Sequence, residues 1–108
     1  MRRKVNQAYW AQNPQGPFAT LILVAATYCH PEAYDGAYED LISRARAAAP
    51  EDEQIRVFRH ELREALGDPV RLPDNELFKA VDYGDGSDQA FLRRLWHDLY
   101  GDDPTAGA

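Results

Sequence analysis

The feature that most constrains the fold is a periodic stretch near the carboxyl end of the chain, Asp88–Tyr100, with the sequence DQAFLRRLWHDLY. Its apolar residues recur at intervals of one and three positions, which is the spacing of a helix with one buried face. Three residues of that face are aromatic: Phe91, Trp96 and Tyr100. Because a face so rich in rings must be covered, we expect a helix here with the rest of the chain packed against it.

The length and the single cysteine limit what kind of protein this is. A chain of 108 residues fits one domain with one modest core, and it needs no disulfide or metal to fold. Cys29 has no second cysteine to pair with, which fits a reducing compartment. The longest apolar run, residues 18–29, falls well short of the roughly 20 residues that a membrane-spanning helix needs. Residues 13–17 also break the place where a secretory signal would have its apolar centre, so we expect a cytoplasmic protein without a membrane segment.

More helices are expected before the last one. Residues 17–28 are apolar almost all round, which places that helix at the centre of the fold. A buried strand is the competing interpretation of this run, but its length and its alanines favour a helix. Helical spacing recurs over residues 34–48, 51–67 and 75–81, and the last of these is expected to bury Phe78.

Proline, glycine and capping residues predict where these helices begin and end. Pro17 suits a first helical position, because the N–H that proline lacks would have no helical partner there. Pro50 is expected to end one helix and open the next, and Gly67 to end that next helix in the left-handed conformation. Asp74 and Ser87 are expected to cap the two helices that follow them.

The resulting prediction is an all-α fold, a single small bundle of about five helices over residues 17–100. Residues 1–16 are expected to form an irregular or briefly helical N-terminal arm, and residues 101–108 a flexible tail. We expect Tyr9 and Trp10 of the arm to pack back onto the bundle. The alternative is an exposed aromatic pair that a partner could contact.

No motif in the chain points to a particular chemistry. The run DYGDGSD invites comparison with a calcium loop, but its aspartates are three positions apart and Arg93 stands where the twelfth-position glutamate should be. His60 and Glu64 share a helical face without a third metal ligand nearby, and nothing beside Cys29 marks it as an activated nucleophile. The sequence also lacks a phosphate-binding glycine loop and a nucleophile elbow. We therefore expect no metal, no cofactor and no catalytic residue, and we favour a protein that is not an enzyme.

Charge is distributed unevenly along the chain. The net charge is −6, yet residues 1–30 contain three basic side chains and no acidic one. The remainder holds all 18 acidic residues against nine Lys and Arg, so it would repel nucleic acid. A helix-turn-helix over residues 55–81 would also have to place DNELFKAV, with its single lysine, in the major groove. We expect no nucleic-acid partner and consider a basic protein the more natural one, although acidity can simply serve solubility.

Tyrosines interspersed with carboxylates suggest where a basic partner protein would bind. The residues expected to contact it are Tyr34, Glu39, Asp82, Tyr83, Asp85 and Asp88. The first functional hypothesis is therefore a small interaction domain without catalytic activity. Small, acidic, all-α proteins include immunity proteins and antitoxins that cover basic toxin sites, so an immunity- or inhibitor-type role is one concrete form of this hypothesis.

Two other hypotheses come from different classes of protein. One is a small ligand-binding or enzymatic helical domain with a site near His30, His60 or His97, which requires a polar pocket that brings at least two of these groups together. The other is an oligomerisation domain that uses the aromatic stripe of the last helix as a subunit interface. The oligomeric state and the identity of the partner stay open at this stage.

Overall fold

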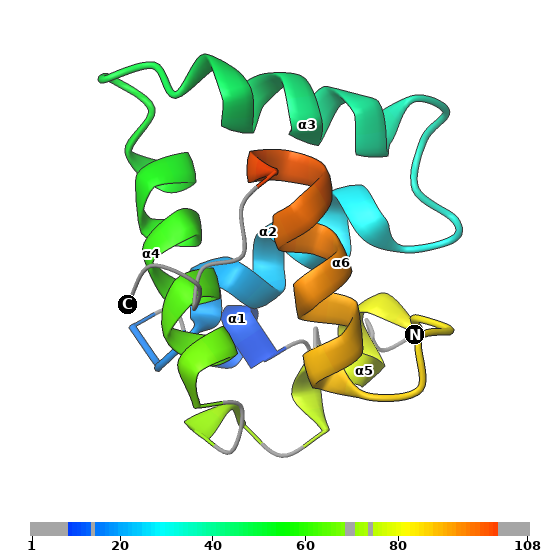
Figure 1. Ribbon diagram of the computed structural model, residues 1–108. Helices are drawn as coiled ribbons and strands as arrows, with labels where there is room; N and C mark the ends of the chain where they lie inside the picture. Colours follow the sequence, from blue (N-terminus) through cyan, green and yellow to red (C-terminus); the bar gives the residue numbers. More distant parts are fainter. Residues whose placement is uncertain (1–8, 14, 69–70, 74, 102–108) are drawn as a thin grey trace, which may run out of the picture.

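The computed structural model describes residues 9–13, 15–68, 71–73 and 75–101 (Figure 1). Within these ranges the chain is all-helical and contains no strand, which confirms the predicted fold class. The helices in order are α1 (Tyr9–Gln12), α2 (Ala19–Cys29), α3 (Ala37–Ala47), α4 (Glu53–Gly67), α5 (Glu76–Val81) and α6 (Asp88–Tyr100). Every helix in the described ranges is too short or too polar to cross a membrane.

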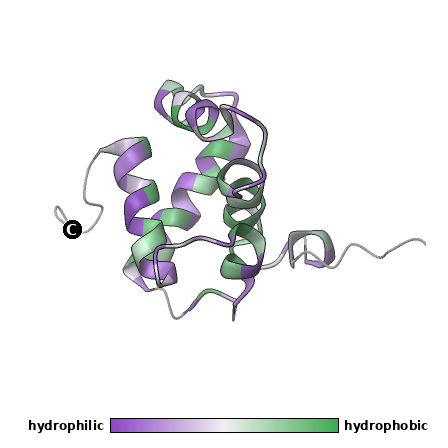
Figure 2. Cartoon of the chain, turned by 90° about the vertical axis from the view of Figure 1, so that its right-hand side faces the viewer, coloured by the Kyte–Doolittle hydropathy of each residue, from purple (hydrophilic) through white to green (hydrophobic). Residues whose placement is uncertain are grey.

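Helix α2 lies at the centre of the bundle. It packs against α1, α3, α4 and α5, while α6 lies across α3 and α4 (Figure 1). Leu21, Ile22, Val24 and Ala25 of α2 are all buried, as the nearly all-round apolar sequence predicts. Figure 2 shows hydrophobic stretches on the sides of the helices that face one another.

One face of α6 is fully covered by the other helices. Its buried residues are Phe91, Leu92, Leu95, Trp96 and Leu99. Ser87 caps the helix as predicted, because its Oγ accepts a hydrogen bond from the Ala90 N–H at 3.1 Å. Phe91 and Trp96 lie inside the molecule, whereas Tyr100 is partly exposed, so most of the aromatic stripe is covered by the chain itself.

The start of α2 differs from the prediction. The helix begins at Ala19 rather than at Pro17, because Phe18 takes a left-handed conformation (φ 62°) that turns the chain just before the helix. The Phe18 ring is buried, and burial of a large apolar side chain offsets the cost of an unfavourable backbone conformation.

The first turn of α2 is completed by a side chain from another helix. Phe18 cannot cap the helix with its side chain, and the Leu21 N–H instead donates to the Glu61 carboxylate of α4 at 2.8 Å. Burial raises the pKa of Glu61, while the Leu21 N–H acts in the opposite direction by stabilising the carboxylate. Glu61 thus fixes α4 against the amino end of the central helix.

Three other helix boundaries correct the sequence interpretation. Gly67 is the last helical residue of α4 and does not adopt the left-handed conformation that was expected of it. Pro50 lies in the turn between α3 and α4, where Ala48 ends α3 at positive φ (46°) and Asp52 caps α4 by accepting from the Ile55 N–H at 3.2 Å.

Tyr9 and Trp10 are partly buried against the core, which confirms that this part of the arm packs back onto the bundle. Helix α1 is a single turn, and the Tyr9 hydroxyl donates to the Pro17 carbonyl at 3.0 Å. Residues 1–8 and 14 of the predicted arm, residues 102–108 of the predicted tail and the proposed cap Asp74 lie outside the described residues.

The contact between Glu61 and α2 gives a first testable prediction. Glu61→Ala removes the acceptor for the Leu21 N–H, so we expect it to lower the free energy of unfolding by about 0.5–2 kcal/mol. Glu61→Gln keeps a side-chain oxygen and is expected to retain most of that stability. Urea unfolding at neutral pH measures both changes.

Glu64→Ala is the matched control for this comparison. Glu64 lies on the same helix, and its ion pairs with His60 and Arg71 are long, at 3.7 and 3.9 Å, so its loss should cost little. If Glu61→Ala and Glu64→Ala unfold at the same urea concentration, Glu61 does not stabilise the start of α2.

Candidate functional site

The residues predicted to bind a partner fall into two groups on neighbouring elements. Tyr34 lies in the loop between α2 and α3, and Glu39 lies in the first turn of α3. The other four, Asp82, Tyr83, Asp85 and Asp88, belong to the segment that links α5 to α6 and to the start of α6. Because α3 packs against α6, the two groups lie on adjacent parts of the molecule.

Tyr34 is exposed but held in place. Its side chain is 55% exposed, and its hydroxyl donates to the Asp40 carboxylate at 2.8 Å. The ring also meets Tyr28 edge to face, with 6.5 Å between ring centroids. The hydrogen bond to Asp40 raises the pKa of Tyr34, so the hydroxyl stays protonated.

Tyr83 and Asp88 interact mainly with other residues of the chain itself. The Tyr83 ring stacks on Phe91 with 5.2 Å between centroids and meets Phe78 edge to face. Its hydroxyl donates to the Asp88 carboxylate. Phe78 itself is 40% exposed, so the expectation that α5 buries it is wrong: Leu77 and Val81 fill the inner side of this short helix, and Phe78 stays on its outer side.

Asp85 forms an ion pair with Arg94. The Arg94 guanidinium donates to both carboxylate oxygens, at 2.7 and 3.0 Å, and this pairing lowers the pKa of Asp85. Arg94 also lies over the rings of Phe91 and Tyr38, at 5.4 and 5.9 Å from their centroids. The positive charge of Arg94 therefore lies between the two groups of predicted partner contacts, and it neutralises the Asp85 carboxylate.

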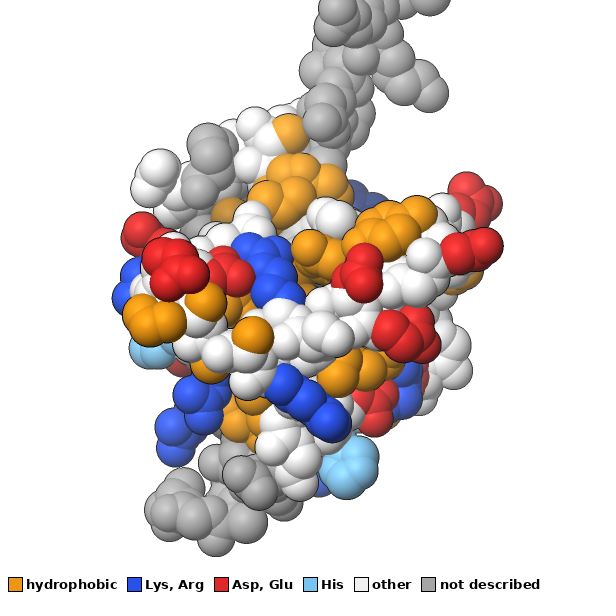
Figure 3. Space-filling view, turned by 90° about the horizontal axis from the view of Figure 1, so that it is seen from above, with side chains coloured by type: hydrophobic (Ala, Val, Ile, Leu, Met, Phe, Trp, Pro, Cys, Tyr) orange, Lys and Arg blue, Asp and Glu red, His pale blue; other side chains and the backbone are white. Residues whose placement is uncertain are grey.

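Four carboxylates around Tyr34 are not neutralised in this way. Glu32, Asp35, Glu39 and Asp40 are all exposed, and none of them forms an ion pair with a described basic residue. We call these four residues together with Tyr34 the Tyr34 patch. In the view onto α3, acidic side chains gather at the right-hand end, where this helix begins (Figure 3).

The histidines named in the ligand-site hypothesis lie apart. His30 lines a shallow hollow of about 350 Å³ beside the Tyr34 patch, together with Cys29 and Arg94. His60 is exposed on α4 and His97 is exposed on α6. No second histidine is among the described residues that line this hollow. In the part of the chain that the structure describes, no three His, Cys, Asp or Glu side chains are grouped as metal ligands.

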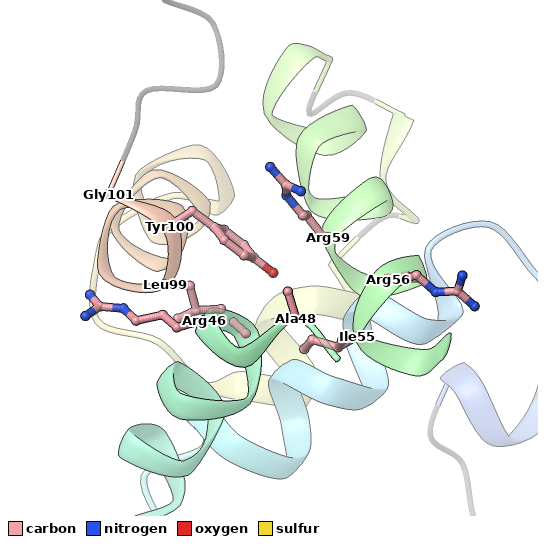
Figure 4. Close-up of a pocket in the computed structure, with 9 residues that line it drawn as sticks. Arg46, Ala48, Ile55, Arg56, Arg59, Leu99, Tyr100 and Gly101 are labelled. Atoms are coloured by element: carbon pink, nitrogen blue, oxygen red, sulfur yellow. The ribbon is translucent and has the colours of Figure 1, made fainter. Parts of the chain in front are cut away.

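A second candidate site lies at the opposite end of α3 and was not expected from the sequence. It is a cavity of about 420 Å³ where α3 ends, α4 begins and α6 ends (Figure 4). Its apolar lining includes Ala45, Ile55 and Leu99. Its polar lining consists of Tyr100 and three arginines, Arg46, Arg56 and Arg59. The predicted contacts for a partner are acidic residues and tyrosines, so these arginines had no predicted role.

The comparisons with known proteins add no relative to this picture. No protein-family model matches the chain, and searches of curated proteins and of solved structures find no match. A function therefore has to be argued from the geometry of the two candidate sites.

The ion pair between Asp85 and Arg94 predicts a pH dependence. Because the pKa of Asp85 is lowered from 3.8 in the folded state, the folded protein binds fewer protons than the unfolded chain in this range, and stability increases with pH. The contribution of the pair is present above about pH 4 and is lost as the pH falls below it. Asp85→Asn should therefore flatten the acid side of the stability curve, as measured by urea unfolding at a series of pH values.

Asp35→Asn is a suitable control for that experiment, because Asp35 forms no ion pair with any described residue. Its curve should run parallel to that of the unchanged protein. An Asp85→Asn curve that also runs parallel would show that the ion pair does not persist in solution.

Cys29 gives an independent prediction about reactivity. Burial raises the pKa of the Cys29 thiol to about 12, so at pH 8 only about one molecule in ten thousand carries the reactive thiolate. We expect 5,5′-dithiobis(2-nitrobenzoate) to label the folded protein at least about tenfold more slowly than the protein in concentrated urea. Equal labelling rates in the two conditions would contradict the burial of this thiol.

Proposed function

We propose that this chain is a protein-interaction domain without catalytic activity that binds a basic surface of a partner protein through the Tyr34 patch. The observation that carries the proposal is the position of Tyr34. It is the more exposed of the two large hydrophobic side chains that stand out on the described surface, and four carboxylates without ion-pair partners among the described residues surround it.

Tyrosine suits a contact of this kind. It offers a large apolar ring and a polar hydroxyl at a low cost in side-chain entropy, and it is enriched in protein interfaces. The hydrogen bond to Asp40 orients the Tyr34 ring before a partner arrives, so less freedom is lost on binding.

Free carboxylates beside the tyrosine favour a basic partner. They attract opposite charge over several ångströms and accelerate association at low salt. Asp52 and Asp85, in contrast, are already paired with Arg44 and Arg94, so they have less charge to offer. Among the residues first predicted, Tyr34, Glu39 and the exposed Asp82 are proposed to contact the partner, whereas Tyr83, Asp85 and Asp88 support the surface from within.

An immunity- or inhibitor-type role is the concrete form of this proposal. In that role the protein covers the basic site of a partner and blocks its action, which requires a complementary surface and no chemistry of its own. A cytoplasmic location belongs to the same proposal, because a reducing compartment suits a protein with one free thiol.

Charge reversal tests the proposal. The protein is used to capture partners from native cell extract, at low and at high salt, and as the double variant Asp35→Lys/Glu39→Lys. We expect a basic protein to be captured at low salt and lost at high salt. Capture by the variant should fall at least about tenfold, with a weaker dependence on salt.

The control variant is Glu51→Lys/Asp68→Lys, which makes the same change in net charge away from Tyr34. Both of these residues are exposed, and they lie at the two ends of α4. If both double variants lose capture equally, net charge and not the Tyr34 patch recruits the partner. If the single variant Tyr34→Ala captures the partner as well as the unchanged protein does, the Tyr34 patch is not the binding surface.

A further inference from the structure

The cavity between α3, α4 and α6 collects positive charge in an acidic protein. The net charge of the chain is −6, yet none of the described aspartates and glutamates lines this cavity, while Arg46, Arg56 and Arg59 do. In Figure 4, Arg59 of α4 lies next to Tyr100, whereas Arg46 of α3 and Arg56 of α4 extend outward to opposite sides of the cavity.

The three arginines differ from most other basic residues in how they are paired. Arg44, Arg71, Lys79 and Arg94 all form ion pairs with carboxylates. No described carboxylate lies within ion-pair distance of the three arginines of the cavity. Arg46 donates one hydrogen bond to the Asp98 backbone carbonyl, at 3.0 Å, but no ion pair with a described carboxylate neutralises any of the three.

Arg59 occupies the most defined position of the three. Its guanidinium lies over the Tyr100 and Trp96 rings, at 5.1 and 5.7 Å from their centroids. The two rings are themselves in contact, with 4.6 Å between centroids. A guanidinium that lies over rings can still use the N–H groups at its edge to donate two parallel hydrogen bonds to a carboxylate.

Two buried donors next to Arg59 have no partner. The Tyr100 hydroxyl and the Trp96 indole N–H are buried, and neither forms a hydrogen bond within the described ranges. Leaving such groups unsatisfied is costly, and it is uncommon in folded proteins. Burial raises the pKa of Tyr100 to about 12, so its hydroxyl keeps its proton at neutral pH. The Tyr100 ring forms part of the cavity wall (Figure 4).

The rest of the lining is apolar. Ala45, Ile55 and Leu99 are buried in the core and contribute to the inner surface of the cavity. A cavity of about 420 Å³ falls in the size range of sites for small molecules, which combine an apolar interior with a few polar groups that orient the ligand.

We propose that this cavity binds a small carboxylic acid with an apolar body. The carboxylate pairs with Arg59, Arg46 and Arg56 add positive charge at a longer distance, and the apolar body lies against Ile55 and Leu99. This site is separate from the Tyr34 patch at the other end of α3, and it does not depend on the proposed partner binding.

Octanoate is a suitable probe because it has an apolar chain and a single carboxylate, and octanamide is its neutral counterpart. Binding is followed by the fluorescence of Trp96 in the full-length chain with Trp10→Phe, so that only the tryptophan next to Arg59 reports. Isothermal titration calorimetry of the unchanged protein gives an independent affinity.

We expect octanoate to bind at least about tenfold more tightly than octanamide, with an affinity that falls as salt is added. Arg59→Gln should weaken octanoate binding about tenfold and leave octanamide unaffected. Arg63→Gln is the matched control, because Arg63 is an exposed arginine on the same helix that does not line the cavity, and it should bind octanoate as the unchanged protein does.

Three results would overturn the proposal. The first is no binding of octanoate at millimolar concentration, and the second is equal binding of acid and amide. The third concerns Asp102 and Asp103, which follow Gly101 at the edge of the cavity. If octanoate binds only after Asp102→Asn/Asp103→Asn, acidic residues of the chain itself, and not a separate acid, are the occupant of the site.

Discussion

Helix α6 buries five large apolar side chains against the other helices, and the position of most polar groups described above follows from how that face is covered. Arg94, in the middle of α6, lies at the edge of the buried face, where it donates to Asp85 and Tyr38. Tyr100, at the carboxyl end of α6, forms part of the wall of the arginine-lined cavity. Both candidate sites therefore lie at the edges of the buried contact between α6 and the other helices.

Helix α3 connects these two sites and differs in charge along its length. Glu39 and Asp40 stand in its first turn, and Arg44 and Arg46 in its last. This order follows the helix dipole, which favours negative charge at the amino end and positive charge at the carboxyl end. Although the whole chain is acidic, α3 thus has an acidic end and a basic end. The acidic end contributes to the Tyr34 patch, and the basic end contributes to the arginine-lined cavity.

The sequence was most informative where periodic apolar patterns decide the structure, as in the buried face of α6 and the central position of α2. It was less informative at helix ends, where contacts between distant residues override local preferences. Phe18 moves the start of α2 because its ring is buried, and Gly67 continues α4 although it could have ended it. The exposed position of Tyr34 could be proposed from its acidic neighbours. The grouping of Arg46 with Arg56 and Arg59 depends on the angle between α3 and α4, which no local pattern encodes.

The bond between Leu21 and Glu61 joins residues 40 positions apart. A helix normally obtains its first-turn partners from its own flanking residues, so it can begin to form alone. Helix α2 instead receives one from a helix that is made later, since a ribosome adds residues in order from the amino end. During synthesis, the central helix of the bundle therefore stays incomplete until α4 has left the ribosome. Until α4 packs against it, the apolar sides of the central helix stay uncovered, and exposed apolar surface of this kind favours misassembly.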